Sequence, residues 1–281
     1  HQVLGQQHEL VATETRHQAS PPDGTQQALR HEQQHPISGA MAGGGADLLF
    51  GGDGNDTLNG GSGNDTQYGE AGNDLFVSGT GNDSVFGGTG EDTASYAAST
   101  AAVAVNLSTG LGSGGHAAGD VLAEIEHLIG STYNDTLTGD AGNNLLDGGS
   151  GNDVLAGGGG NDSLIGGAGT DTADYSASGA GVTVNLGAGT ASGGDAAGDV
   201  LTQIENLLGT TYADILTGDA NANTFTSGAG DDSLYGAAGS DSLYGESGHA
   251  TISGGAGDDW LFGDTGNDVL QGDAGIDWVV M

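Results

Sequence analysis

Residues 51–59 carry the sequence Gly51-Gly52-Asp53-Gly54-Asn55-Asp56-Thr57-Leu58-Asn59, and this nine-residue unit recurs along most of the chain. Its copies fill residues 42–95, 130–174 and 209–280, with six, five and eight copies respectively, nineteen in all. A short unit repeated this often at a fixed period is typical of a solenoid, in which each unit packs against its neighbours.

Each position of the unit has a physical role. Glycine at the first, second and fourth positions allows positive φ, so that the backbone can turn tightly and direct its carbonyl oxygens toward a common point. The sixth position is Asp except at Asn144, Asn223 and Ala250, and the eighth is apolar except at Gln67. The last three residues are too short for a helix and predict a strand with one inward side chain. Two units per coil therefore predict an all-β, flattened parallel β-roll with an aliphatic ladder between two sheets.

The repeat resembles that of the RTX (repeats-in-toxin) family of secreted bacterial proteins, everywhere except in residues 1–41 and two inserts. The resemblance implies a right-handed parallel β-roll (a β-solenoid) that binds Ca²⁺ between the turns of copies n and n+2. Such pairs give four, three and six candidate sites in the three blocks, so ten or more ions are expected. The pairs through Asn144 and Asn223 should bind more weakly, and those through Ala250 are the candidates for empty sites.

Calcium takes six to eight oxygen ligands, and in this family they would come from the sixth-position aspartates and the turn glycines. The residues to which the resemblance assigns metal binding are Asp47, Gly52, Gly54, Asp56, Gly61, Gly63, Asp65, Asp74, Asp83, Asp92, Asp135, Gly149, Gly151, Asp153, Gly158, Gly160, Asp162, Asp171, Asp214, Asp232, Asp241, Gly255, Gly257, Asp259, Asp268 and Asp277.

The charge balance favours the same interpretation. The chain has 38 acidic residues against two arginines and no lysine, which gives a formal net charge of −36. A compact body with this charge repels itself unless cations neutralise it. The alternative for such a tract is disorder, and we expect that state when calcium is absent. The lack of a basic surface argues against nucleic acid as a partner.

Two inserts, 96–129 and 175–208, separate the blocks and match each other with a shift of 79 residues. The segments Val103-x-Val105-Asn106-Leu107 and Val182-x-Val184-Asn185-Leu186 alternate in polarity, which predicts a strand with one buried face. The expected role of the inserts is structural: they would join the RTX blocks 42–95, 130–174 and 209–281.

Two features of the inserts leave alternatives open. Leu122, Ile125, Leu128 and Ile129 fit either another rung of the roll or a helical turn, because periodicity does not separate the two. A ligand site at Asp120 and Asp199, or at Glu126 and Glu205, is the less favoured alternative to a purely structural role.

Residues 1–41 differ in composition and are rich in His and Gln, so they are interpreted as a flexible linker or tail. Within them, residues 31–35 (His-Glu-Gln-Gln-His) fit the H-E-x-x-H zinc motif. Pro36 disfavours helix at His35, and the further Gly and His of the extended motif are replaced by Ser38 and Met41. We therefore interpret this match as a coincidence of composition.

The sequence as a whole predicts a secreted, extracellular calcium-binding module without catalysis of its own. It contains no Cys and no apolar run of membrane-spanning length. By resemblance, type I secretion machinery would export it; the usual C-terminal signal would have to be the short segment 277–281, or the chain is a fragment. One alternative is the accessory domain of a secreted hydrolase, such as a serralysin-type protease, a lipase or an epimerase.

The other alternative is an adhesive or carbohydrate-binding module. Tyr244, Trp260, Phe262 and Trp278 occupy outward positions of alternate copies, so they should share one sheet face. A glycan or a protein is the candidate partner of such a face. The favoured interpretation is that a C-terminal cap covers it or that it stiffens the sheet.

Overall fold

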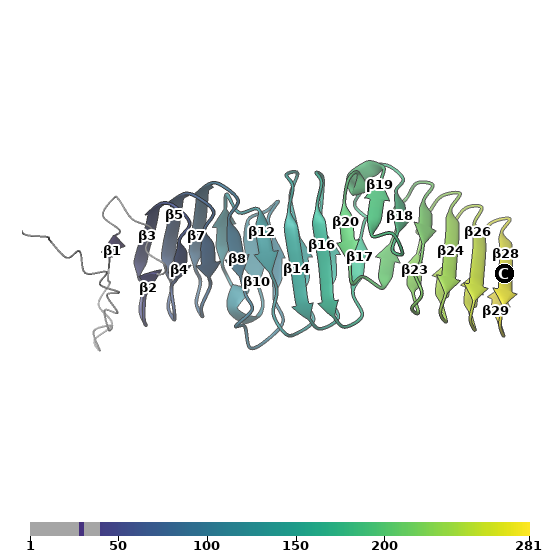
Figure 1. The fold of residues 1–281 in the computed structure, drawn as a ribbon, viewed down its shortest axis with the longest axis horizontal. Coiled ribbons are helices and arrows are strands. Elements are labelled where there is room, and N and C mark those ends of the chain that lie inside the picture. The colour runs from purple at the N-terminus through teal and green to yellow at the C-terminus, as the bar shows by residue number, and fades with distance from the viewer. Residues whose placement is uncertain (1–27, 31–39) are drawn as a thin grey trace, which may run out of the picture.

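The computed structural model describes residues 28–30 and 40–281, and these form an elongated parallel β-solenoid of about 13 turns (Figure 1). The repeats alternate between two facing sheets, so that one coil takes two repeats and strands pair with strands 18 residues further on. The all-β parallel roll predicted from the nine-residue period is therefore confirmed.

The first sheet, sheet A, has 15 strands in the described part of the chain. In spatial order they are β1 (Ala28–Arg30), β3 (Leu48–Asp53), β5 (Thr66–Ala71), β7 (Ser84–Thr89), β11 (Val121–Ala123), β10 (Leu111–Ser113), β9 (Ala104–Asn106), β13 (Thr136–Thr138), β15 (Val154–Ala156), β17 (Thr172–Asp174), β21 (Asn206–Leu208), β23 (Thr224–Thr226), β25 (Ser242–Tyr244), β27 (Trp260–Phe262) and β29 (Trp278–Val280).

The second sheet, sheet B, has 14 strands in the same residues. In spatial order they are β2 (Ala40–Met41), β4 (Thr57–Asn59), β6 (Leu75–Val77), β8 (Thr93–Ser95), β12 (His127–Ile129), β14 (Leu145–Ser150), β16 (Ser163–Ala168), β20 (Val200–Thr202), β19 (Thr190–Ser192), β18 (Thr183–Asn185), β22 (Ile215–Thr217), β24 (Ser233–Ala238), β26 (Thr251–Ala256) and β28 (Val269–Ala274).

The eighth-position side chains point between the sheets and form the core. Leu49, Leu58, Leu155 and Leu243 have no exposed surface, and their flanking residues are partly exposed because side chains alternate across a strand. Gln67 occupies the same ladder and is equally buried. The core is therefore one continuous ladder of side chains between the two sheets, and each added coil lengthens it.

Both inserts are built into the sheets. In the first, β9, β10 and β11 form an antiparallel meander within sheet A, and β12 adds a regular rung to sheet B. Val103 and Val105 are 2% exposed, as the alternation predicts. Residues 121–129 form rungs and not a helical turn. The helices of the described residues are the 3-10 turns η1 (Gly115–Ala117) and η2 (Gly194–Ala196), far too short to cross a membrane.

The two inserts lie on opposite sheets although they are duplicates. The second insert places its meander, β18 to β20, in sheet B and its closing rung β21 in sheet A. Five repeats separate the inserts, and each repeat crosses from one sheet to the other. Because five is an odd number, the strands of the second insert lie on the sheet opposite to those of the first.

Two short segments of residues 1–41 differ from the expected organisation, and one of them, Ala40–Met41, is β2 of sheet B. Residues 28–30, which the composition assigns to a flexible linker, form β1 and pair in parallel with β3. This part of the chain therefore extends sheet A. The H-E-x-x-H segment lies outside the described residues.

Candidate metal centres at the stacked turns

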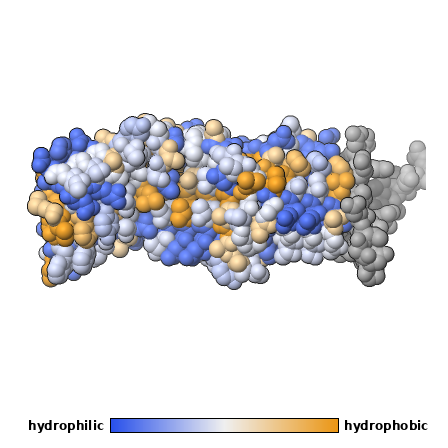
Figure 2. All heavy atoms as spheres, turned by 180° about the vertical axis from the view of Figure 1, so that it is seen from behind, coloured by the Kyte–Doolittle hydropathy of each residue, from blue (hydrophilic) through white to orange (hydrophobic). Residues whose placement is uncertain are grey.

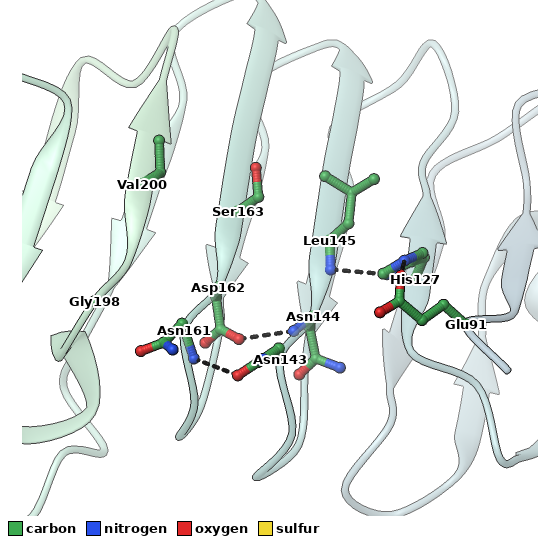
Figure 3. Close-up of a pocket in the computed structure, with 10 residues that line it drawn as sticks. All are labelled: Glu91, His127, Asn143, Asn144, Leu145, Asn161, Asp162, Ser163, Gly198 and Val200. Carbon is green, nitrogen blue, oxygen red and sulfur yellow. Dashed lines mark hydrogen bonds and ion pairs between the residues drawn. The ribbon is translucent and has the colours of Figure 1, made fainter.

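The sixth-position aspartates form a ladder along each edge of the roll. One carboxylate oxygen, Oδ1, accepts the backbone N–H of the equivalent residue one coil earlier, as in Asp47 to Asp65 at 2.8 Å and Asp153 to Asp171 at 2.8 Å. Figure 3 shows one such step, from the Asn144 N–H to Asp162, beside a parallel step between Asn161 and Asn143. The aspartates thus have a structural role before any ion is considered.

The second carboxylate oxygen, Oδ2, lies buried and unpaired in many of these turns. It has no hydrogen-bond partner in Asp65, Asp74, Asp83, Asp92, Asp153, Asp162, Asp171, Asp241 and Asp259, all of which are 2% exposed or less. Leaving a buried anionic oxygen unpaired is costly. These atoms therefore require a cation or a proton.

The unpaired oxygen points into a space that only glycine leaves open. A Cβ on Gly148 would lie within 3.0 Å of both Asp153 Oδ2 and the carbonyl oxygen of Gly166 in the next coil. The corresponding oxygens of other coils converge beside Gly69 (Asp74 Oδ2 and the Gly87 carbonyl) and beside Gly236 (Asp241 Oδ2 and the Gly254 carbonyl). No cluster of three or more acidic or histidine side chains occurs in the described residues, so carbonyl oxygens must complete any coordination shell. A carboxylate together with main-chain carbonyls is a hard, all-oxygen ligand set, which fits calcium.

The turn glycines at the second and fourth positions have the backbone conformation that their type predicts. Gly52, Gly54, Gly61 and Gly63 have φ between 88° and 129°, and Gly149, Gly151, Gly158, Gly160, Gly255 and Gly257 are also positive. A Cβ at Gly63 would collide with the backbone of Gly45 one coil earlier. Successive turns therefore stack too closely for a side chain.

Burial changes the acidity of these carboxylates. It raises the pKa of Asp65, Asp92, Asp153, Asp162 and Asp241 from 3.8 to about 6, and nearby carboxylates in the same ladder add to the shift.

The pKa shifts predict a pH dependence when calcium is removed. Between pH 4 and 6, roughly, the folded chain binds more protons than the unfolded chain, so its free energy of unfolding decreases as the pH rises through this range. Lowering the pH of a calcium-free sample from neutral to about 4 should therefore increase β-structure, measured by circular dichroism. A transition centred near pH 4, where exposed carboxylates titrate, would instead indicate general relief of charge repulsion.

The turns around the inserts satisfy their carboxylates differently. Asp120 continues the ladder by accepting the Asp83 N–H at 2.8 Å, but its Oδ2 accepts the Tyr96 hydroxyl at 3.0 Å. The duplicate does the same: Asp199 accepts the Asp162 N–H at 2.9 Å and the Tyr175 hydroxyl at 3.0 Å. Both acids are buried. The tyrosine thus pairs with the oxygen that is left unpaired in the ordinary turns.

The first turn after each insert also satisfies its carboxylate with hydrogen bonds from within the chain. Asp135 Oδ2 accepts the Ser131 N–H, and its Oδ1 accepts the Ser131 hydroxyl and the Val103 N–H. In the duplicate, Asp214 has the corresponding bonds from Thr210 and from the Val182 N–H. The repeat pattern predicts Asp135 and Asp214 as metal ligands, but hydrogen bonds from within the chain occupy both carboxylate oxygens of each. We call residues 96–135 and 175–214 the cassettes.

Glu126 and Glu205 are further members of the ladders that the repeat pattern does not include. Glu126 accepts the Asp92 N–H at 2.8 Å, and Glu205 accepts the Asp171 N–H at 2.9 Å. Asn144 and Asn223 follow them, and the side-chain amide of each donates a hydrogen bond to the main-chain oxygen of the preceding glutamate.

Ala250 interrupts one ladder, as expected, while its N–H still donates to Asp268. Asp232 and Asp277 accept N–H groups like the others, and Asp277 is only partly buried at the C-terminal end.

The aromatic face predicted near the C-terminus is present on sheet A, and Figure 2 shows apolar surface at this end of the roll. The rings stack on each other: Trp260 and Trp278 have centroids 5.4 Å apart, and Tyr244 and Phe262 4.7 Å. Stacking of this kind covers the ring faces that a sugar would need. This geometry favours stiffening of the sheet, as does a second stack of Phe50, Tyr68 and Phe86 that the sequence analysis missed.

A shallow surface depression lies beside His127 (Figure 3). His127 Nδ1 accepts the Leu145 N–H at 3.1 Å, and its Nε2 lies 3.6 Å from Glu91, which is 71% exposed. An ion pair with so exposed a partner contributes little energy.

The fold and the stacked turns define a class of protein: a parallel β-solenoid whose turns carry buried carboxylates with one unpaired oxygen. The family model for the RTX calcium-binding nonapeptide repeat matches residues 40–67, 68–95, 123–155, 147–177, 208–243 and 244–279, well over half of the chain. The chain therefore belongs to the RTX calcium-binding repeat family. No curated protein matches it in a direct comparison. The residues that the family model leaves out include most of each insert.

Proposed function

We propose that this chain is a secreted module that folds on binding calcium, with ions held at the stacked turns whose aspartate Oδ2 has no partner within the chain. The observation that carries the proposal is the series of buried, unpaired carboxylate oxygens, several of which lie beside a main-chain carbonyl of the next coil, as at Asp74, Asp153 and Asp241. Ten or more ions are expected, held by the aspartates and turn glycines assigned above apart from Asp135 and Asp214, whose oxygens are paired within the chain.

The energetics make calcium a switch. With 38 acidic residues and two basic ones, the compact state is opposed by repulsion that divalent ions relieve. The ligands of one ion lie on different coils, so a site exists only when the coils are stacked. Binding free energy is therefore folding free energy. In the calcium-poor cytosol the chain would stay unfolded for export by type I secretion machinery, and it would fold where calcium is millimolar.

The dependence of folding on calcium is expected to be weakest in the cassettes. Tyrosine, serine and threonine donors satisfy their carboxylates without an ion. We infer that the cassettes retain structure at calcium concentrations at which the plain repeats open, and that folding of the repeats spreads outward from them. A role without catalysis of its own, as scaffold or accessory domain, fits this arrangement. Docking of a protein on the Trp260 face, where Trp260 and Trp278 remain 47% and 58% exposed, is the second proposal.

Hydrogen–deuterium exchange of the full chain, with and without calcium, tests this proposal. Amides of 42–80 and 236–280 should be protected only in calcium, whereas those of the cassettes should keep part of their protection in chelator. The double variant Tyr96→Phe, Tyr175→Phe should remove that remaining protection, because each hydroxyl bond to a buried carboxylate is worth about 1.5–3 kcal/mol.

Tyr68→Phe is the matched control, since Tyr68 stacks with Phe86 in the stripe on sheet A and should leave the cassettes unchanged. Equal protection of the repeats in calcium and in chelator would refute the calcium-driven fold. Cassettes that exchange as fast as the repeats in chelator would refute only their independence.

A further inference from the structure

Gln67 is a polar side chain inside an otherwise apolar ladder. It lies on β5 between Leu49 of β3 and Val85 of β7, and it is completely buried. Neither its amide nitrogen nor its amide oxygen has a hydrogen-bond partner. An isolated buried amide is unfavourable, so its presence calls for a partner that the polypeptide itself does not supply.

The amide points at an unpaired carboxylate. The position that a Cβ on Gly60 would occupy lies 2.7 Å from Gln67 Nε2 and 2.5 Å from Asp65 Oδ2. Asp65 is 2% exposed; its Oδ1 accepts the Asp47 N–H, and its Oδ2 has no partner. The buried Ser78 hydroxyl follows on the same edge, at the first position of the next coil, beside the Tyr96 hydroxyl.

This arrangement differs from the ordinary turn in one respect. Beside Gly148 the two nearest oxygens are Asp153 Oδ2 and the carbonyl oxygen of Gly166. Beside Gly60, the amide nitrogen of Gln67 is the nearest atom after Asp65 Oδ2. Rotation about the last side-chain torsion exchanges the amide oxygen and nitrogen, so the same side chain can present an oxygen to this point.

We propose that Gln67 is a further calcium ligand, which presents its amide oxygen to the ion held at the Asp65 turn. The inference rests on the proposed function. Side-chain amide oxygens are among the ligands that calcium accepts, and an ion between the two groups would satisfy both. The ladder then tolerates a polar residue at this rung because the residue completes a metal site.

The test compares Gln67→Leu with the wild-type full chain, in calcium and in chelator. Binding is measured by equilibrium dialysis with calcium and by competition with a chromophoric chelator, and stability by urea unfolding. In calcium, one site should lose at least about tenfold in affinity, the lower limit known for even outer-shell partners of a metal. In chelator the same variant should be more stable than the wild type, because an unpaired buried amide has been removed.

Gln67→Glu supplies a second measurement, since it keeps the oxygen and adds charge: it should bind the ion more tightly and be less stable in chelator. Val85→Ile, an apolar change on the next rung, should leave the ion count and affinities unchanged. A Gln67→Leu variant that gains stability equally with and without calcium, and keeps every site, would overturn the proposal. A wild-type chain that binds no calcium would overturn the proposed function as well.

Discussion

Adding calcium to the chelator-treated full chain should convert its far-UV circular dichroism spectrum cooperatively from coil to β-sheet. The two long sheets are joined through short turns, and nine of those turns bury a carboxylate oxygen that has no hydrogen-bond partner. Without cations these charges, together with a formal net charge of −36, oppose stacking of the coils. We expect the cassettes to account for the β-signal that remains in chelator.

Magnesium is the control for this titration. It is smaller, requires near-octahedral geometry and loses its water reluctantly, so it should not produce the transition at the same concentration. A spectrum that is already fully β-rich in chelator would mean that the leucine ladder stabilises the fold alone, and that calcium does not control folding.

Replacing Gly148 by Ala should destabilise the calcium-loaded chain strongly. Gly148 does not have positive φ, so alanine introduces no backbone strain. Its Cβ would instead occupy the space in front of Asp153 Oδ2 and the Gly166 carbonyl. Overpacking costs about 1–3 kcal/mol, and losing an ion present at 100 times its Kd costs about 2.7 kcal/mol more. Urea unfolding in calcium measures the sum, and calcium dialysis measures the lost site.

Gly159→Ala is the matched control in the same block. A Cβ there meets nothing closer than the Cα of Ala141 at 3.9 Å, and its φ is not positive. This change should be neutral or stabilise by about 0.4–1 kcal/mol, because it restricts the unfolded chain. If the two variants behave alike, the space beside Gly148 is not part of an ion site.

Much of the architecture could be predicted because the nine-residue period is local. The strand at residues 57–59, the inward Leu58 and the positive φ of Gly52 and Gly54 all follow from their places in the unit. The partner of Asp120 could not be predicted. Tyr96 is 24 residues away, and the meander that brings the two together has no periodicity that fixes its path.

The sequence by itself determined the parallel roll, the apolar ladder and the aspartates at the turns, since these depend on side-chain alternation and glycine backbone freedom at fixed spacing. Only the tertiary structure decided which carboxylates have a hydrogen-bond donor for their second oxygen and which do not. That depends on whether a donor such as Tyr96, Ser131 or Thr210 lies within hydrogen-bonding distance. It also decided that the Trp260 and Trp278 rings face each other, because ring orientation follows from the register between coils.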